Sequence, residues 1–315
     1  MYHLGTLVPG VRRWTLPLSR DDFILLLVAV NQIFLGIDIY LAHLADQKIQ
    51  PGEWIPIIFG PTAGALLLAA GVLALWRRRA AAILATTVYV ASAVVGLLGI
   101  YFHLIRAALP TGPITYRLTT RLLVWGPPFL GPLMFVIIAL FGISAVWRED
   151  PPDSGRLGLG NRLRVRLPLR KTDVLFLLVG AAAMVATVSA VFDHARTGWE
   201  NANLWIPTLV GAFTAVVCFA LAAIRTPRWG DLVVYAVAMA AMVVTGLLGA
   251  WFHFQANITA RGTIIAERFI RGAPIMAPLL YANVALFGIV ALLDPRPRTR
   301  EERAAAGEPE PALQR

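Results

Sequence analysis

The chain has 315 residues, of which 58% are hydrophobic and only 15% charged, and its formal net charge is +10. Soluble domains are about half apolar and a quarter charged, so this composition indicates a membrane protein and excludes a disordered or collagen-like chain. A single cysteine, Cys218, excludes an internal disulfide, a CxxC redox pair and an iron–sulfur site. The basic residues lie in short clusters between apolar runs, which is typical of membrane topology and not of nucleic-acid binding.

Eight apolar runs are long enough to cross a hydrocarbon core of roughly 30 Å, which takes about 20 helical residues. Backbone groups inside lipid must be hydrogen-bonded within the chain, so each run is expected to be a helix and the fold class to be all-α. In chain order, the predicted spans are 23–45, 54–76, 80–105, 123–147, 173–195, 205–224, 232–255 and 272–293. Pro132 and Pro278 lie inside the fourth and eighth spans, where they are expected to kink the helix.

The distribution of basic residues predicts the orientation. The segments 1–22, 77–79, 148–172, 225–231 and 294–315 hold 20 of the 28 Lys and Arg, and the four connections at the opposite side hold 8. Cytoplasmic segments carry the excess of Lys and Arg, so both termini are expected in the cytoplasm of a bacterial inner-membrane protein. The first 22 residues lack the apolar region of a signal peptide, and residues 294–315 have the composition of a disordered cytoplasmic tail.

The two halves of the chain repeat one another in sequence. Blocks recur in the same order at offsets that drift from 151 to 146 residues: Trp54-Ile55-Pro56 as Trp205-Ile206-Pro207, Leu97-Leu98-Gly99 as Leu247-Leu248-Gly249, and Ala139-Leu140-Phe141-Gly142 as Ala285-Leu286-Phe287-Gly288. The pattern predicts two tandem four-helix repeats, 23–147 and 173–293, joined by a basic linker, 148–172. An even number of spans in each copy gives both copies the same orientation.

Four histidines occupy related positions in the repeats: His43, His103, His194 and His253. Each lies about 20 to 23 residues into a span that runs outward, or roughly 30–35 Å along a helix, and therefore at the outer membrane boundary. Two imidazoles at the same depth in one copy can meet on a single ligand. We therefore expect His43 to approach His103, and His194 to approach His253.

Three interpretations of these histidines remain open. Each pair can hold one haem b, with Arg106, Arg117 and Arg121 pairing with its propionates. Alternatively, the imidazoles can bind copper, iron or zinc, helped by Asp193, Asp46, Glu53 or Glu200. The third interpretation is structural, because histidines beside aromatic residues at a span end often serve only as interfacial residues. No HExxH run, Cys ligand or pair of ligands at i,i+4 spacing supports a metal directly.

The functional hypotheses follow from this set. The first is a redox-linked subunit that binds haem or metal at the outer face and exchanges electrons with quinone or with another subunit. The others are a non-catalytic anchor or assembly subunit of a membrane complex, and a small-solute transporter built around the two repeats. Polar residues within the spans are few, namely Asn31, Gln32, Asp38 and Asn283, and no catalytic motif indicates a stand-alone enzyme.

Overall fold

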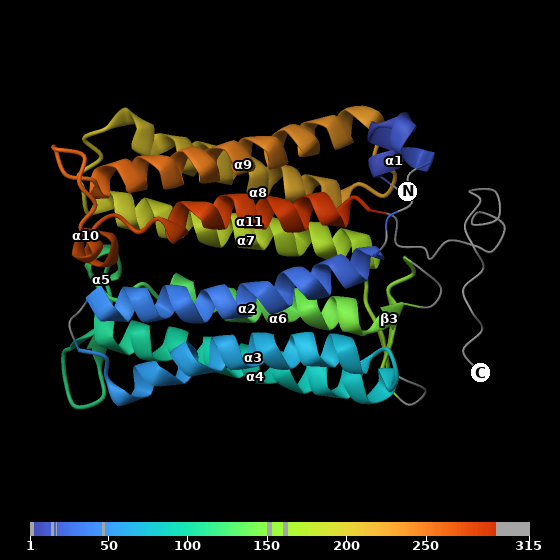
Figure 1. The fold of residues 1–315 in the computed structure, drawn as a ribbon, viewed down its shortest axis with the longest axis horizontal. Coiled ribbons are helices and arrows are strands. Elements are labelled where there is room, and N and C mark those ends of the chain that lie inside the picture. Colours follow the sequence, from blue (N-terminus) through green and yellow to red (C-terminus); the bar gives the residue numbers. More distant parts are fainter. Residues whose placement is uncertain are drawn as a thin grey trace.

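The computed structural model describes residues 3–13, 16, 18–45, 48–149, 153–159 and 163–293. Eight helices run side by side along the long axis of the molecule (Figure 1). They are α2 (Arg20–Ala45), α3 (Trp54–Leu73), α4 (Arg78–Ala107), α6 (Leu130–Val146), α7 (Lys171–Ala195), α8 (Trp205–Ala223), α9 (Trp229–Asn257) and α11 (Met276–Ala291). Each of the eight predicted apolar runs thus contains one of these helices, and most of its length is helical.

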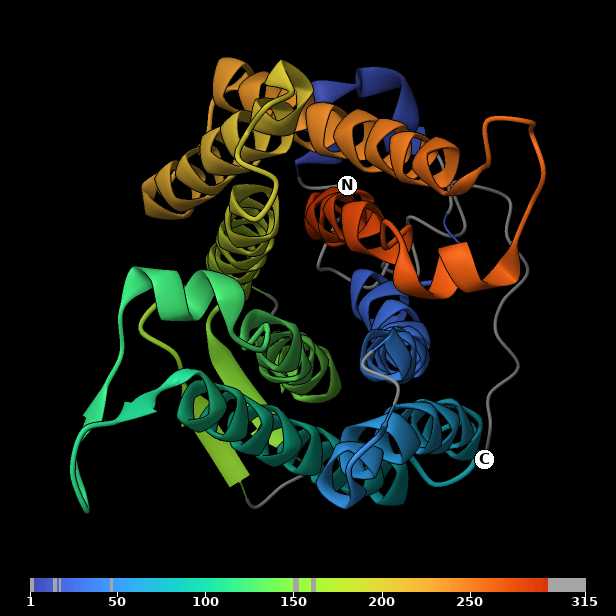
Figure 2. The ribbon, with the colours of Figure 1, turned by 90° about the vertical axis from the view of Figure 1, so that its left-hand side faces the viewer.

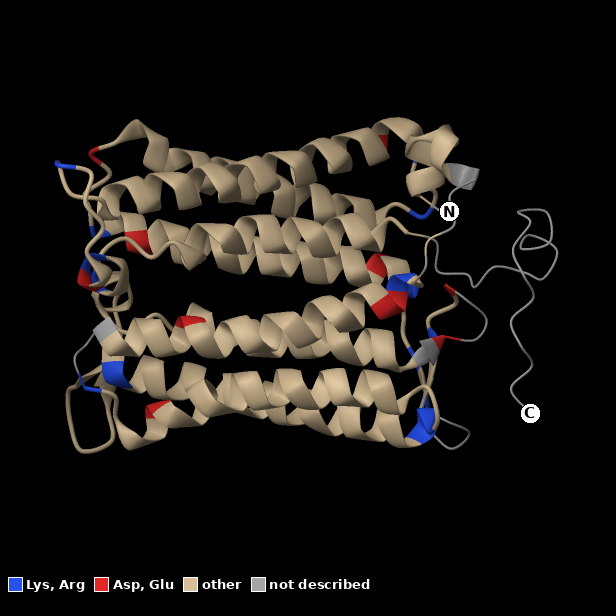
Figure 3. Ribbon diagram, in the orientation of Figure 1, with Lys and Arg blue, Asp and Glu red and all other residues tan. Residues whose placement is uncertain are grey.

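Helix length and hydropathy make the chain a polytopic membrane protein. Within the described residues, six helices are long and apolar enough to cross a bilayer: α2, α3, α4, α7, α8 and α9. The remaining two, α6 and α11, are apolar but shorter, at 17 and 16 residues. Lys, Arg, Asp and Glu gather at the two ends of the helices and leave the middle almost free of charge (Figure 3).

The predicted fourth span is interrupted. A short helix, α5 (Thr120–Trp125), ends at the Gly126-Pro127-Pro128 segment before α6 begins, and α10 (Ala266–Arg271) precedes α11 in the same way. The predicted kinks were wrong, because Pro132 and Pro278 are the third residues of α6 and α11. In a first helical turn the N–H that proline lacks has no helical acceptor anyway, so these prolines begin a helix instead of bending one.

The helices pack as two closed rings of four. In one ring, α2, α3, α4 and α6 contact one another in turn, and in the other α7, α8, α9 and α11 do the same. The rings meet where α2 packs on α11 and α6 packs on α7 (Figure 2). One buried apolar cluster runs through both rings. At the junction, Phe141 stacks on Phe287 with ring centroids 4.5 Å apart.

The segment between the two rings is more ordered than a linker. Its strands β3 (Arg148–Glu149), β4 (Arg156–Leu159) and β5 (Leu163–Arg166) form an antiparallel sheet in that order. At the same end of the bundle lie α1 (Leu4–Leu7) and η1 (Pro9–Arg13), and Leu4 N–H donates to the carbonyl of Leu292. The opposite end carries the hairpin β1 (Leu109–Pro110) and β2 (Tyr116–Arg117), with η2 (Pro51–Glu53) and η3 (Ala202–Leu204).

Helices α2 and α3 pack closely against one another at Gly60. A Cβ on Gly60 would lie 2.6 Å from the carbonyl oxygen of Gln32 and 2.7 Å from the backbone of Gly36, which cannot move without separating the helices. Gly60→Ala should therefore lower the free energy of unfolding by about 1–3 kcal/mol. Gly71→Ala, on the same helix but with open space around it, is the matched control. Equal unfolding midpoints for the two variants in mixed detergent micelles would contradict this packing.

Candidate functional site

The first histidine pair lies at the end of the bundle that carries the β1–β2 hairpin. His43 is in the last turn of α2 and His103 is near the end of α4, and their ring centroids are 6.0 Å apart at an interplanar angle of 62°. Both side chains are partly buried. The structure therefore brings these two imidazoles into edge-to-face contact, as their matched depth in the sequence led us to expect.

The second pair has an equivalent place in the other ring. His194 lies in the last turn of α7 and His253 near the end of α9, and among the described ring contacts His194 meets Trp199 and not His253. The fifth histidine, His3, lies at the opposite end of the molecule, buried against Phe176. Burial lowers the pKa of His3 to about 4, so this histidine is neutral at pH 7.

All four imidazoles hold the same tautomer. His43 Nδ1 lies 2.8 Å from the carbonyl oxygen of Ile39, and His194 Nδ1 lies 3.2 Å from that of Leu204. A carbonyl oxygen only accepts hydrogen bonds, so each Nδ1 carries the proton and donates it. In a neutral imidazole with its proton on Nδ1, Nε2 is the nitrogen whose lone pair is available to a ligand.

In His103 and His253, the acceptor comes from the proline-rich breaks. His103 Nδ1 donates to the carbonyl of Pro128 at 3.0 Å, and His253 Nδ1 donates to that of Pro274 at 2.8 Å. The chain is not helical at these points, so the carbonyls have no helical donor, and an unpaired carbonyl at membrane depth is costly. These two histidines therefore close the break before α6 and before α11 as well as presenting Nε2.

Charged neighbours distinguish the first pair. Glu53, at the end of η2, interacts electrostatically with both His43 and His103. Its Oε1 accepts from Arg106 Nη1 at 2.6 Å, and its Oε2 accepts from the backbone N–H of Gln50. Of the other two arginines considered for haem propionates, Arg117 is exposed on β2 and Arg121 is exposed on α5. Neither has a described contact with an imidazole.

Aromatic rings surround the second pair. Trp199 meets His194 edge to face with centroids 5.8 Å apart, and stacks on Trp205 at 4.3 Å. Its backbone φ is +58°, a conformation that costs a residue other than glycine free energy, so packing holds Trp199 there. Asp193 interacts electrostatically with His194 and His253, as well as with Arg196.

The described residues contain no group of three or more His, Cys, Asp and Glu side chains placed to hold a metal ion. Any ion at these pairs would therefore have two imidazole ligands, with water or a partner completing the coordination. Of the acidic residues proposed as further ligands, Glu200 is exposed and Asp46 lies outside the described residues.

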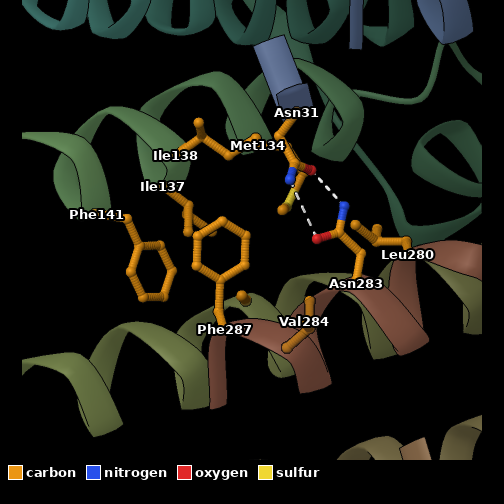
Figure 4. Close-up of a pocket in the computed structure, with 10 residues that line it drawn as sticks. Asn31, Met134, Ile137, Ile138, Phe141, Leu280, Asn283, Val284 and Phe287 are labelled. Carbon is orange, nitrogen blue, oxygen red and sulfur yellow. Dashed lines mark hydrogen bonds between the residues drawn. The ribbon is translucent and has the colours of Figure 1, made fainter. Parts of the chain in front are cut away.

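A second polar feature lies deep within the membrane-spanning part, between the two rings. Asn31 on α2 and Asn283 on α11 exchange amide hydrogen bonds beside a cavity of about 10 Å³ (Figure 4). Nearby in the chain, Gln32 Nε2 donates to Ser92 Oγ at 2.6 Å. The sequence marked these side chains as polar but gave no sign that Asn31 would meet Asn283, 252 residues later. The cavity has room for about one water molecule.

Comparison with protein-family models, with curated proteins and with solved structures finds no match to this chain.

Proposed function

We propose that this membrane protein binds a transition-metal ion between His43 and His103, and a second between His194 and His253. The observation that carries the proposal is the shared tautomer of paired imidazoles. Every Nδ1 donates to a backbone carbonyl, which leaves each Nε2 as a ligand. Outer hydrogen bonds of this kind orient metal-binding histidines in proteins, and imidazole suits copper, iron, nickel and zinc.

The surroundings of the first pair favour an ion over haem. Arg106, which interacts electrostatically with His103, is already bonded to Glu53 and is not free for a propionate. Glu53 places a negative charge beside both imidazoles, which stabilises a bound cation. A carboxylate at that place would repel haem propionates.

We further propose that the two rings are tandem copies of one four-helix unit with the same orientation. Three matched contacts support this. His103 and His253 reach the carbonyl of equivalent residues, Gly99 and Gly249 both lie against a proline that starts the next span, and Phe141 stacks on its own counterpart Phe287. Placing the basic segments in the cytoplasm sets both histidine pairs at the outer face of a bacterial inner membrane.

In this position, a bound copper or iron ion would serve as a one-electron carrier at the outer surface. We propose that the protein is a redox-linked subunit, which exchanges electrons through this ion with a quinone in the bilayer or with another subunit. The chain itself supplies the imidazole ligands and the charge of Glu53 and holds the two rings in place.

The experiment that tests this function is an optical spectrum of the purified protein, oxidised and dithionite-reduced, with metal analysis of the same sample. We expect copper or iron at up to two ions per chain and no Soret band, whereas zinc alone would keep the ion site but contradict the redox role, because zinc carries no electron. A Soret band with visible bands that sharpen on reduction would show that the histidines bind haem b and not a metal ion. The proposal would be contradicted by purified protein that contains neither a metal ion nor haem, and that takes up neither Cu²⁺ nor Zn²⁺ on dialysis.

A further inference from the structure

A pocket separate from the histidine pairs lies where α9 ends and α10 begins its turn toward α11. Its volume is about 360 Å³, at the small end of the range for ligand pockets. Its walls include Asn257, Glu267, Arg268 and Arg271, together with the backbone of Gly272 and Ala273. Two arginines and one glutamate therefore line one pocket, which gives its lining a net positive charge.

The floor of the pocket is rigidly built. Asn257 is only 2% exposed, and its side-chain amide forms two hydrogen bonds with the backbone of Ala273. Nδ2 donates to the carbonyl at 2.8 Å, and Oδ1 accepts from the N–H at 2.9 Å. A Cβ on Gly272 would lie 2.2 Å from Asn257 Oδ1 and 2.3 Å from the carbonyl of Arg268, so the close approach requires glycine. These contacts fix α10 against the end of α9.

The two arginines retain donors for a ligand. Arg268 uses Nη2 on the carbonyl of Ala256 at 3.0 Å. Arg271 pairs with Glu267 at 3.5 Å, but the two side chains are 44% and 69% exposed, and exposed pairs of this kind contribute little. An anion with several oxygens could accept from both guanidinium groups, since each has five N–H donors in a planar fork.

Aromatic residues of the kind found at the membrane–water interface lie beside the pocket. Phe254 on α9 contacts Phe269 on α10 at 5.5 Å and stacks on Trp251 at 5.9 Å. In the alignment of the two halves, Leu122 and Trp125 stand where the second half has Arg268 and Arg271. The basic pocket is therefore particular to the second half.

We propose that this pocket binds the phosphate group of an anionic membrane lipid. Arg268 and Arg271 would hold the phosphate oxygens, and the aromatic residues of α9 would lie against the acyl chains. Arginine is favoured for phosphate because its fork forms two parallel charge-assisted hydrogen bonds. Basic pockets beside membrane helices recognise lipid headgroups in this way.

Native mass spectrometry of the purified protein tests the proposal. Detergent-solubilised protein is delipidated and mixed with phosphatidylglycerol or with phosphatidylcholine, and the retained lipid is counted. Wild type should retain phosphatidylglycerol in preference. The double variant Arg268→Gln/Arg271→Gln should bind phosphatidylglycerol about tenfold more weakly. A tenfold change in affinity corresponds to the loss of at least one charge-assisted hydrogen bond. Arg261→Gln, exposed in the same connection but outside the pocket, removes one charge and is the control for the single variants Arg268→Gln and Arg271→Gln.

Three results would overturn the proposal. They are unchanged phosphatidylglycerol retention in the double variant, a loss in Arg261→Gln equal to that in the single variants, and displacement of the lipid by inorganic phosphate at a similar concentration, which would assign the pocket to a free anion. Because the double variant could also unfold, its thermal midpoint is measured in parallel. If it is lowered, the single variant Arg271→Gln, which changes an exposed side chain, decides between the outcomes.

Discussion

Replacing Asp21 by Asn is expected to lower the free energy of unfolding by about 3 kcal/mol, a larger cost than that of other single changes at this end of the bundle. Lys171, the first residue of α7, is 1% exposed, and its Nζ lies 2.7 Å from Asp21 Oδ2 in the first turn of α2. Without Asp21 the ammonium group remains buried with its nearest counter-charge removed. The estimate is at the low end for buried pairs because Asp21 itself is 32% exposed.

The ion pair between Lys171 and Asp21 joins the two rings, and a second hydrogen bond between the same two helix starts runs in the opposite direction. Arg20, one residue before Asp21, is also buried, and its Nη1 donates to Thr172 Oγ1 at 2.7 Å, while Thr172 donates to Asp153. Each basic residue at the start of one helix thus reaches across to the start of the other. Loss of Asp21 should therefore loosen the junction between the rings as well as one ion pair.

The difference in exposure supplies the control. Lys171→Met leaves Asp21, which water can reach, and should cost about 1 kcal/mol or less. The double variant Asp21→Asn/Lys171→Met should be more stable than Asp21→Asn alone, since the buried Lys171 ammonium that has lost its counter-charge is then removed. Reversible unfolding in mixed micelles measures all three. An Asp21→Asn cost equal to or smaller than that of Lys171→Met would show that the buried ammonium is compensated by other groups.

Replacing His103 by Asn is expected to weaken metal binding at the first pair by more than about 100-fold and to leave the second pair unchanged. Loss of groups that merely orient a metal ligand already costs 10–100-fold, so loss of one of two imidazole ligands should cost more. The amide nitrogen of Asn takes the place of Nδ1 and still donates to the carbonyl of Pro128, so the break before α6 stays closed.

His253→Asn is the matched variant in the other ring, where Nδ1 donates to Pro274. It should abolish binding at the second pair alone. Trp199, 5.8 Å from His194, reports on that pair because a bound paramagnetic ion such as Cu²⁺ quenches neighbouring tryptophan fluorescence. The part of the quenching that comes from Trp199, taken as the difference from Trp199→Phe, should therefore survive His103→Asn and disappear in His253→Asn. If both variants bind metal as wild type does, the histidines have only their structural role.

Hydropathy and matched depth predicted much of this architecture. The apolar runs gave the helices, and equal distances from each helix start placed His43 beside His103, since helical rise is constant along a chain. The prolines of the fourth and eighth spans were misread because a proline in a helix and a proline that begins one look alike in the sequence. Only the helix start at Leu130 or Met276 distinguishes them.

Other features depend on contacts between distant residues, which no local pattern records. The donation of His103 to Pro128 requires the break before α6, and the Asn31–Asn283 pair requires α2 to lie on α11. The linker sheet was missed because its strands are at most four residues long and rich in Arg. The pocket at α10 was missed because Arg268 and Arg271 appeared in the sequence only as exceptions to the positive-inside pattern.

X-ray absorption at the metal edge shows which side chains hold the ions in wild-type protein loaded with one equivalent of copper or zinc per histidine pair. We expect scattering from two imidazole rings per ion, with nitrogen near 2 Å. His103→Asn should retain one ion per chain, at the second pair, still with two imidazoles. A spectrum of oxygen ligands without imidazole scattering would show that the histidines do not hold the ions.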